Sequence, residues 1–128
     1  MDEATKNLIP EADRDFLEGK EYVYEIIPGN GCIYLKLKNF DFPAGYTPQK
    51  ADLLVIIPSG YPNAALDMFR TSPDVKLINN NWPQTAQSRD IHMGINWQVW
   101  SRHFIWRVGV DSLRTYLTAV KKELSKCV

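Results

Sequence analysis

Apolar and polar positions alternate in the first third of the chain, as they do in β-strands with one buried face. Turn-forming residues at positions 28–31 (PGNG) separate two β-rich runs and predict a hairpin of strands 21–27 and 32–37. In the second run, three apolar side chains share one face and three polar or amphipathic ones the other: Ile33, Leu35 and Leu37 against Tyr34, Lys36 and Lys38. One face of this sheet should therefore be buried and the other hydrated.

A near-continuous apolar run at residues 51–57 (ADLLVII) predicts a central strand of the same sheet. A fourth strand is expected at 68–70 or 75–78, although Pro73 interrupts this stretch. From residue 79 to 107 no periodicity is convincing, yet the stretch holds all four tryptophans and both histidines. We predict a long ordered loop there, and loops of that length tend to be functional.

Two segments carry helical signals. Residues 9–19 have a proline suited to a first turn and Gly19 as a stop, and predict a short helix. The final segment is the clearest helix, with Asp111 as its N-cap and one apolar stripe: Leu113, Leu117, Val120 and Leu124. The order of a short helix, three or four antiparallel strands, a long loop and a helix predicts an α+β two-layer domain.

Composition narrows the choice of function classes. The 128 residues fit one domain over 1–128, and their formal charge of +0 argues against a nucleic-acid module. Two cysteines and two histidines lie too far apart for a zinc spacing, so no metal or cofactor is expected. The charged N-terminus lacks an apolar targeting segment, and no stretch reaches the ~20 apolar residues of a membrane span. We expect a cytoplasmic protein that binds no membrane.

Four motifs then follow one another along the chain, at residues 58–62 (PSGYP), 97–103 (WQVWSRH), 106–109 (WRVG) and 111–117 (DSLRTYL). This ordered set resembles the ubiquitin-conjugating (UBC) superfamily over roughly residues 9–126. It looks closest to the divergent bacterial branch encoded beside ubiquitin-like proteins, an activating-enzyme homologue and a metallopeptidase. The resemblance implies a UBC-like α+β fold: a four-stranded antiparallel meander, a short N-terminal helix, a long active-site loop and a C-terminal helix.

The chain departs from that superfamily at the catalytic cysteine. Standard members carry this cysteine about ten residues after a histidine and about eight residues before a late tryptophan. Here counting back eight from Trp106 reaches Gln98, and counting forward ten from His92 reaches Arg102. No cysteine lies in that window, because Cys32 falls in the early hairpin and Cys127 in the C-terminal tail. We interpret both as a small buried residue or a tail thiol. The resemblance therefore implies conjugation without the usual thioester.

Ser101 is the candidate replacement, nine residues after His92 and five before Trp106. A serine nucleophile needs a base, and His103 would share its side of an extended loop because side chains alternate with period two. His92 completes the candidate catalytic set, with loop support as its alternative role. The amides of residues 79–81 (NNN) are candidate oxyanion donors, against the simpler interpretation of a polar turn.

The predicted function is acyl transfer between protein partners. The chain would accept the C-terminal glycine of a ubiquitin-like modifier from an activating-enzyme homologue, as an oxyester on Ser101, and pass it to an amine. Two other functions stay open. One is a non-catalytic adaptor or scaffold of the same fold, which fits the missing thiol. The other is a small hydrolase using Ser101 and His103, which is disfavoured because no Gly-x-Ser-x-Gly motif is present.

Overall fold

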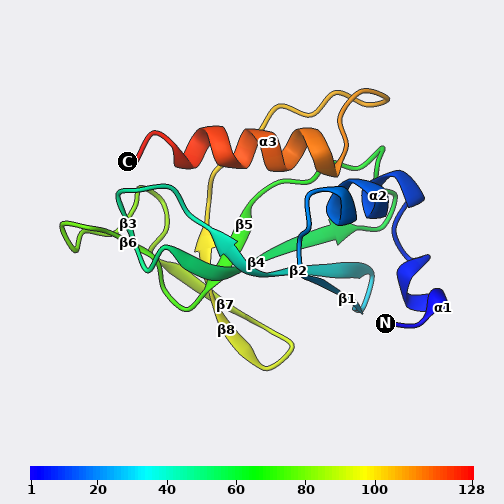
Figure 1. The fold of residues 1–128 in the computed structure, drawn as a ribbon, viewed down its shortest axis with the longest axis horizontal. Helices are drawn as coiled ribbons and strands as arrows, with labels where there is room; N and C mark the ends of the chain where they lie inside the picture. The colour runs from blue at the N-terminus through cyan, green and yellow to red at the C-terminus, as the bar shows by residue number, and fades with distance from the viewer.

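A six-stranded antiparallel sheet with one long helix across its face forms the centre of the protein, as seen in the computed structural model, which describes residues 1–128 (Figure 1). The helices are α1 (Glu3–Lys6), α2 (Glu11–Gly19) and α3 (Leu113–Leu124). The strands are β1 (Tyr24–Pro28), β2 (Cys32–Asp41), β3 (Tyr46–Thr47), β4 (Lys50–Pro58), β5 (Phe69–Ser72), β6 (Lys76–Leu77), β7 (Ser88–His92) and β8 (Ile95–Trp100). The α+β class and the antiparallel meander are confirmed.

Strand order in the main sheet is β1-β2-β4-β5-β8-β7, and β3 pairs with β6 in a separate two-stranded sheet. The first four strands are the expected meander, in which the PGNG turn joins β1 to β2. Both positions considered for a fourth strand are occupied: β5 begins at Phe69, and β6 covers Lys76 and Leu77. Pro73 lies between these two strands, where it removes no ladder hydrogen bond from either.

The prediction of an irregular stretch from 79 to 107 was wrong, because β7 and β8 form a hairpin inside it. Alternation fails as a signal in β8 because both of its faces are buried. Trp97 and Val99 lie on one face and Gln98 and Trp100 on the other, and none of the four is more than 6% exposed. A strand buried on both sides carries no polar face for a period-two pattern to reveal.

The β7–β8 hairpin folds back over the sheet face opposite α3, where Figure 1 shows it below the meander. Three strands separate β2 from β7 in the sheet order, yet the Tyr34 hydroxyl of β2 lies 3.1 Å from Nδ1 of His92 at the end of β7. Strands in a flat sheet are ~4.8 Å apart, so this contact requires strong curvature. The curvature buries Trp97 and Leu54 completely, outside the main core.

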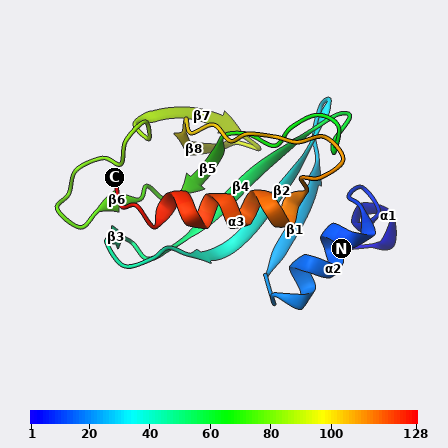
Figure 2. The ribbon, with the colours of Figure 1, turned by 90° about the horizontal axis from the view of Figure 1, so that it is seen from above.

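Helix α3 covers the other face and lies across the strands (Figure 2). Its apolar stripe is buried as predicted, and Tyr116 joins it in the main core with Phe69 and Trp100. The N-cap is Ser112, not Asp111 as predicted. The Thr115 hydroxyl accepts the Ser112 N–H at 2.9 Å, whereas the Asp111 carboxylate accepts the N–H of Arg107 at 2.6 Å and so closes the preceding turn.

Tyr61 of the 58–62 motif joins both ends of the helical layer. Its hydroxyl donates to Oδ2 of Asp13 on α2 at 2.7 Å and accepts the N–H of Leu113, the first residue of α3, at 2.8 Å. Asp13 is 4% exposed, and this burial raises the pKa of its carboxyl although the hydrogen bond from Tyr61 opposes the shift. The tyrosine therefore orients α2 and α3 relative to the end of β4.

We expect Tyr61→Phe to destabilise the fold by about 1–3 kcal/mol, because a buried carboxylate and the Leu113 N–H both lose their partner. Urea unfolding followed by circular dichroism measures the change. Tyr24→Phe is the matched control, because that hydroxyl makes one long contact of 3.4 Å with an exposed Glu18. Equal free energies of unfolding for Tyr61→Phe and Tyr24→Phe would contradict the prediction that the Tyr61 hydroxyl holds α2 and α3 together.

We expect Asp13→Asn to gain stability over the wild type as the pH rises. Burial raises the pKa of Asp13 in the folded protein above its ordinary value of 3.8. The protonated carboxyl therefore contributes fully to the free energy of unfolding below pH 3.8, and this contribution is lost as the pH rises through the folded-state pKa. The side-chain amide of Asp13→Asn cannot ionise, so the variant keeps its stability as the pH rises. Urea midpoints between roughly pH 3 and pH 7 should diverge for Asp13→Asn and not for Asp15→Asn, an exposed position on the same helix. Parallel midpoint curves would contradict the prediction.

Candidate functional site

The segment after β8 carries Ser101 and His103 along the outside of the molecule. The backbone N–H of Ser101 donates to the Thr85 carbonyl at 2.9 Å, which fastens the start of this segment to the loop before β7. Exposure then alternates: Ser101 is half-buried, Arg102 is 7% exposed and His103 is exposed. Alternate burial of this kind is the mark of an extended chain lying on a surface.

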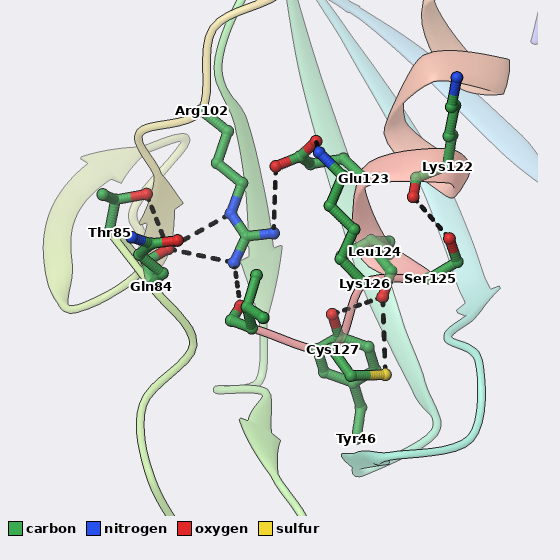
Figure 3. Close-up of polar contacts among 11 residues, drawn as sticks. Tyr46, Gln84, Thr85, Arg102, Lys122, Glu123, Leu124, Ser125, Lys126 and Cys127 are labelled. Atoms are coloured by element: carbon green, nitrogen blue, oxygen red, sulfur yellow. Dashed lines mark hydrogen bonds and ion pairs between the residues drawn. The ribbon is translucent and has the colours of Figure 1, made fainter.

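Arg102 anchors the segment from within (Figure 3). Its guanidinium stacks on Trp100 at 5.1 Å, donates to the Gln84 carbonyl at 3.1 Å and to the Val128 carbonyl, and lies 3.8 Å from the carboxylate of Glu123 on α3. A buried cation without such partners would be costly, so these contacts hold Arg102 in place. The residues on either side of it are held with it.

His103 is oriented by Asp67, which lies just before β5. Its Nδ1 is 3.0 Å from both carboxylate oxygens of Asp67, and Nε2 is left free. The Tyr116 hydroxyl donates to the Asp67 carbonyl and fixes that residue against α3. This contact is exposed and adds little stability, but it sets the direction of the imidazole and favours the tautomer of the neutral ring that carries hydrogen on Nδ1. The Ser101 hydroxyl has no hydrogen-bond partner, and none joins it to His103.

A shallow cleft of about 410 Å³ runs between this segment and α3. It is mostly apolar, and Ile105 at its rim is 91% exposed. The lining residues are Phe104, Ile105, Trp106, Arg107, Asp111, Thr115, Tyr116 and Ala119. An apolar cleft with one charged pair at its edge suits an extended peptide segment better than a free ion.

Trp106 closes one end of the cleft and contacts the 58–62 motif. Its indole Nε1 donates to the Pro62 carbonyl at 3.0 Å, and its ring lies 6.1 Å from the ring of Tyr61. Two motifs that are 44 residues apart in the sequence are thus in direct contact. The loop bearing Ser101 and His103 is fixed at its beginning by Arg102 and at its end by this tryptophan.

Gln98 occupies the position eight residues before Trp106 and is fully buried. Its Oε1 accepts from the Thr71 hydroxyl at 2.8 Å and the Val75 N–H at 2.7 Å, and its Nε2 donates to the carbonyls of Val75 at 2.9 Å and Ala86 at 3.0 Å. A carboxamide has about four hydrogen-bonding positions, and all are used. This side chain supports structure and is closed to chemistry.

His92 lies apart from Ser101, because the whole length of β8 separates them. Its Nδ1 is 3.1 Å from the Tyr34 hydroxyl, and its Nε2 is 3.0 Å from Oδ2 of Asp90, at ion-pair distance. Arg70 binds both carboxylate oxygens of Asp90: its Nε donates to Oδ1 at 3.1 Å, and its Nη2 donates to Oδ2 at 2.9 Å. Although burial raises the pKa of Asp90, the contacts with Arg70 and His92 outweigh this and hold it below its usual range.

The three asparagines at 79–81 are exposed and form a turn. Asn79 Oδ1 accepts the N–H of Asn81 at 3.0 Å, which is an ordinary use of asparagine at a turn. Cys32 and Cys127 are free thiols, each half-buried. No group of three His, Cys, Asp or Glu side chains lies close enough to hold a metal ion. None of the helices is long and apolar enough to cross a membrane.

Sequence reasoning missed Asp67 and Tyr34 as partners of the two histidines. No local signal identifies Asp67, because it lies 36 residues from His103 in an irregular stretch. Tyr34 gave a partial signal, since alternation placed it on the exposed face of its strand. The contact with His92 depends on the curvature of the sheet, which a strand pattern does not reveal.

The family of the chain follows from comparison with known proteins. The family model described as prokaryotic E2 family E matches residues 9–127. The chain belongs to this family. No curated protein and no solved structure matches it. As a bacterial E2 of the UBC-like kind, it is a protein related to ubiquitin-like conjugation, and the resemblance drawn from its motifs is confirmed. The family relationship implies a ubiquitin-like modifier and an activating enzyme as partners.

We expect Gln98→Ala to cost about 3 kcal/mol or more, because the Thr71 hydroxyl and the polar backbone groups of Val75 and Ala86 lose their buried partner. Urea unfolding measures the loss. Gln84→Ala is the matched control, since Gln84 is exposed and contributes only its backbone carbonyl. A loss of less than 1 kcal/mol would show that the carboxamide network is dispensable.

Proposed function

We propose that this E2-like protein accepts the C-terminal glycine of a ubiquitin-like modifier from an activating-enzyme homologue, as an oxyester on Ser101, and transfers it to an amine in the cytoplasm. The observation that carries the proposal is the Asp67–His103 pair, two residues from Ser101 along an anchored extended segment. A carboxylate that orients an imidazole is the arrangement that lets the imidazole act as base for a serine nucleophile.

The proposed reaction has two steps. The Ser101 oxygen attacks the thioester carbonyl of the activated modifier, Nε2 of His103 takes the hydroxyl proton, and the thiolate of the activating enzyme leaves. An amine then attacks the oxyester carbonyl, and the Ser101 oxygen recovers a proton from His103 as it leaves. The neutral imidazole then takes the proton that the amine nitrogen loses as the amide forms. Asp67 favours the imidazolium that forms between the steps, because its carboxylate already faces Nδ1 at 3.0 Å. His92 is remote from this reaction and takes no part in it.

The cleft beside α3 supports the binding part of the proposal. The extended C-terminal segment of a modifier could lie between residues 104–107 and α3, with its terminal carbonyl near Ser101. Exposed Ile105 provides an apolar contact at the rim, and exposed Val108 and Val110 continue this surface beyond Trp106. Apolar side chains exposed in one continuous loop are typical of a protein contact surface.

An adaptor function is the second candidate, and Gln98 is the observation that favours it. The position that holds the nucleophile in standard E2 enzymes carries a fully bonded structural side chain here. An adaptor would use the same cleft to hold a modifier or an enzyme without forming a covalent bond. The two functions differ in one observable, the covalent adduct.

We expect an adduct when the protein is incubated with ATP, a ubiquitin-like modifier and an activating-enzyme homologue that charges this modifier. An oxyester resists thiols and is cleaved by hydroxylamine, so the adduct should survive dithiothreitol and be lost with hydroxylamine. Ser101→Ala should abolish it, and His103→Gln should slow its formation at least ~100-fold, the usual contribution of a general base. Intact-mass spectrometry measures both.

Ser88→Ala is the matched control, because Ser88 is an exposed serine on β7 that faces no histidine. An adduct that persists in Ser101→Ala would exclude this nucleophile. A thiol-sensitive adduct lost in Cys32→Ala or Cys127→Ala would exclude oxyester chemistry. Absence of any adduct with an activating enzyme that is demonstrably active would establish the adaptor function.

A further inference from the structure

A second polar cluster lies on the sheet face away from α3, where no helix covers it. Tyr34 comes from β2, Arg70 from β5, and Asp90 and His92 from β7. The Tyr34 hydroxyl lies 3.1 Å from Nδ1 of His92, whose Nε2 lies 3.0 Å from Oδ2 of Asp90. The hydroxyl, the imidazole and the carboxylate thus lie next to one another, and the buried Nε2 approaches Asp90 at ion-pair distance without a hydrogen bond. The Ser101 site lies at the opposite end of β8 and shares none of these residues.

The fold holds the imidazole firmly at this place. The backbone carbonyl of His92 accepts the indole N–H of Trp97 at 3.2 Å, and Trp97 is fully buried beneath the hairpin. The rings of Tyr34 and His92 pack with their centroids 5.4 Å apart. The curvature of the sheet therefore brings the Tyr34 hydroxyl to the imidazole of His92. Because both rings are already held by packing, the contact costs little additional side-chain entropy.

Charge in the cluster is arranged for proton transfer from the tyrosine. Arg70 donates two hydrogen bonds to Asp90 and keeps that carboxylate ionised. The ionised carboxylate beside Nε2 favours the imidazolium that forms when Nδ1 takes a proton from Tyr34. A nucleophile, a base and a group that stabilises the charged base, each within reach of the next, make up an activated nucleophile.

We propose that Tyr34, His92 and Asp90 form a second acyl-acceptor site, at which the Tyr34 hydroxyl takes an acyl group from an activated ester or thioester. The tyrosine oxygen attacks the acyl carbonyl, and its proton passes to Nδ1 of His92. The bond from carbonyl to leaving group breaks, and the alcohol or thiol departs with the proton from the imidazole. The product is an aryl ester on Tyr34.

An aryl ester suits further transfer better than an alkyl ester does. The ordinary pKa of a tyrosine is about 10 and that of a thiol about 8.5, so a phenolate is nearly as good a leaving group as a thiolate. Attack by Tyr34 nevertheless needs the base. Burial and the neighbouring Cys32 thiol raise the pKa of its hydroxyl, so the free phenolate is scarce and the proton must pass to His92.

An acyl donor can reach the cluster from solvent. The side chains of His92 and Asp90 are 21% and 34% exposed, and Ile91 between them is 70% exposed on the other face of the edge strand. Tyr34 itself is half-buried, on the sheet face that α3 leaves uncovered. The donor would approach along the open face between β2 and β7.

The test uses 4-nitrophenyl acetate on the whole chain and needs neither a modifier nor an activating enzyme, so its outcome is independent of the oxyester proposal. Acetylation of each tyrosine is followed by peptide mass spectrometry. Tyr34 should acetylate at least ~10-fold faster than Tyr24, which is its control on the neighbouring strand because its hydroxyl faces a carboxylate and no imidazole. The excess should vanish in urea, where both tyrosines lose their surroundings.

His92→Gln should lower the acetylation rate of Tyr34 to that of Tyr24. Circular dichroism checks that this variant folds. If it does not fold, the comparison of wild-type rates with and without urea tests the proposal instead. Cys32→Ala should leave the Tyr34 rate within about two-fold of the wild-type value. Equal native rates for Tyr34 and Tyr24 would overturn the proposal. Loss of Tyr34 acetylation in Cys32→Ala would also overturn it, because the thiol would then be the true acceptor.

Discussion

The carboxamide of Gln98 joins the parts of the chain that a four-stranded meander alone would leave unconnected. Its four hydrogen bonds link β8 to β5 through Thr71, to the chain after β5 through Val75, and to the loop before β7 through Ala86. These groups are buried, so each would cost free energy if it were unpaired. Because β8 is held there, the hairpin can curve over the sheet and the segment after Trp100 starts at a defined point.

The candidate sites at the two ends of β8 both depend on this placement. At one end, Arg102 leaves the strand and is captured by Gln84 and Glu123, which sets Ser101 and His103 on the outside. At the other end, the hairpin brings His92 to Tyr34. One buried strand thus positions two histidines on different faces of the molecule, each beside a carboxylate, and His92 also contacts the Tyr34 hydroxyl.

The chain belongs to an E2 family, yet it has no cysteine in the window before Trp106 where standard members carry their nucleophile. The UBC-like frame, the tyrosine of the 58–62 motif and the late tryptophan are retained and contact one another through Tyr61 and Trp106. The side chain eight residues before Trp106, Gln98, is part of the core. The acyl chemistry proposed for this protein therefore uses other groups: Ser101 with His103 and Asp67, and Tyr34 with His92 and Asp90.

Local patterns were sufficient for much of the fold. The PGNG turn, the alternation of β2 and the apolar stripe of α3 each act over a few residues, so the hairpin, the meander and the final helix could be predicted from the sequence. The family resemblance also came from the order of motifs, and the lack of a cysteine in the expected window is a property of the sequence alone.

The tertiary structure decided what depends on contacts between distant residues. The hairpin of β7 and β8 escaped prediction because both faces of β8 are buried, which removes the alternation that marks a strand. Asp67 meets His103 across 36 residues, and Tyr34 meets His92 across 58, through curvature that no local pattern encodes. The sequence by itself determined the first hairpin, the meander, the final helix and the absence of a cysteine before Trp106. Only the packed structure determined which carboxylate each histidine faces and that Tyr34 meets His92, because such neighbours are set by long-range packing.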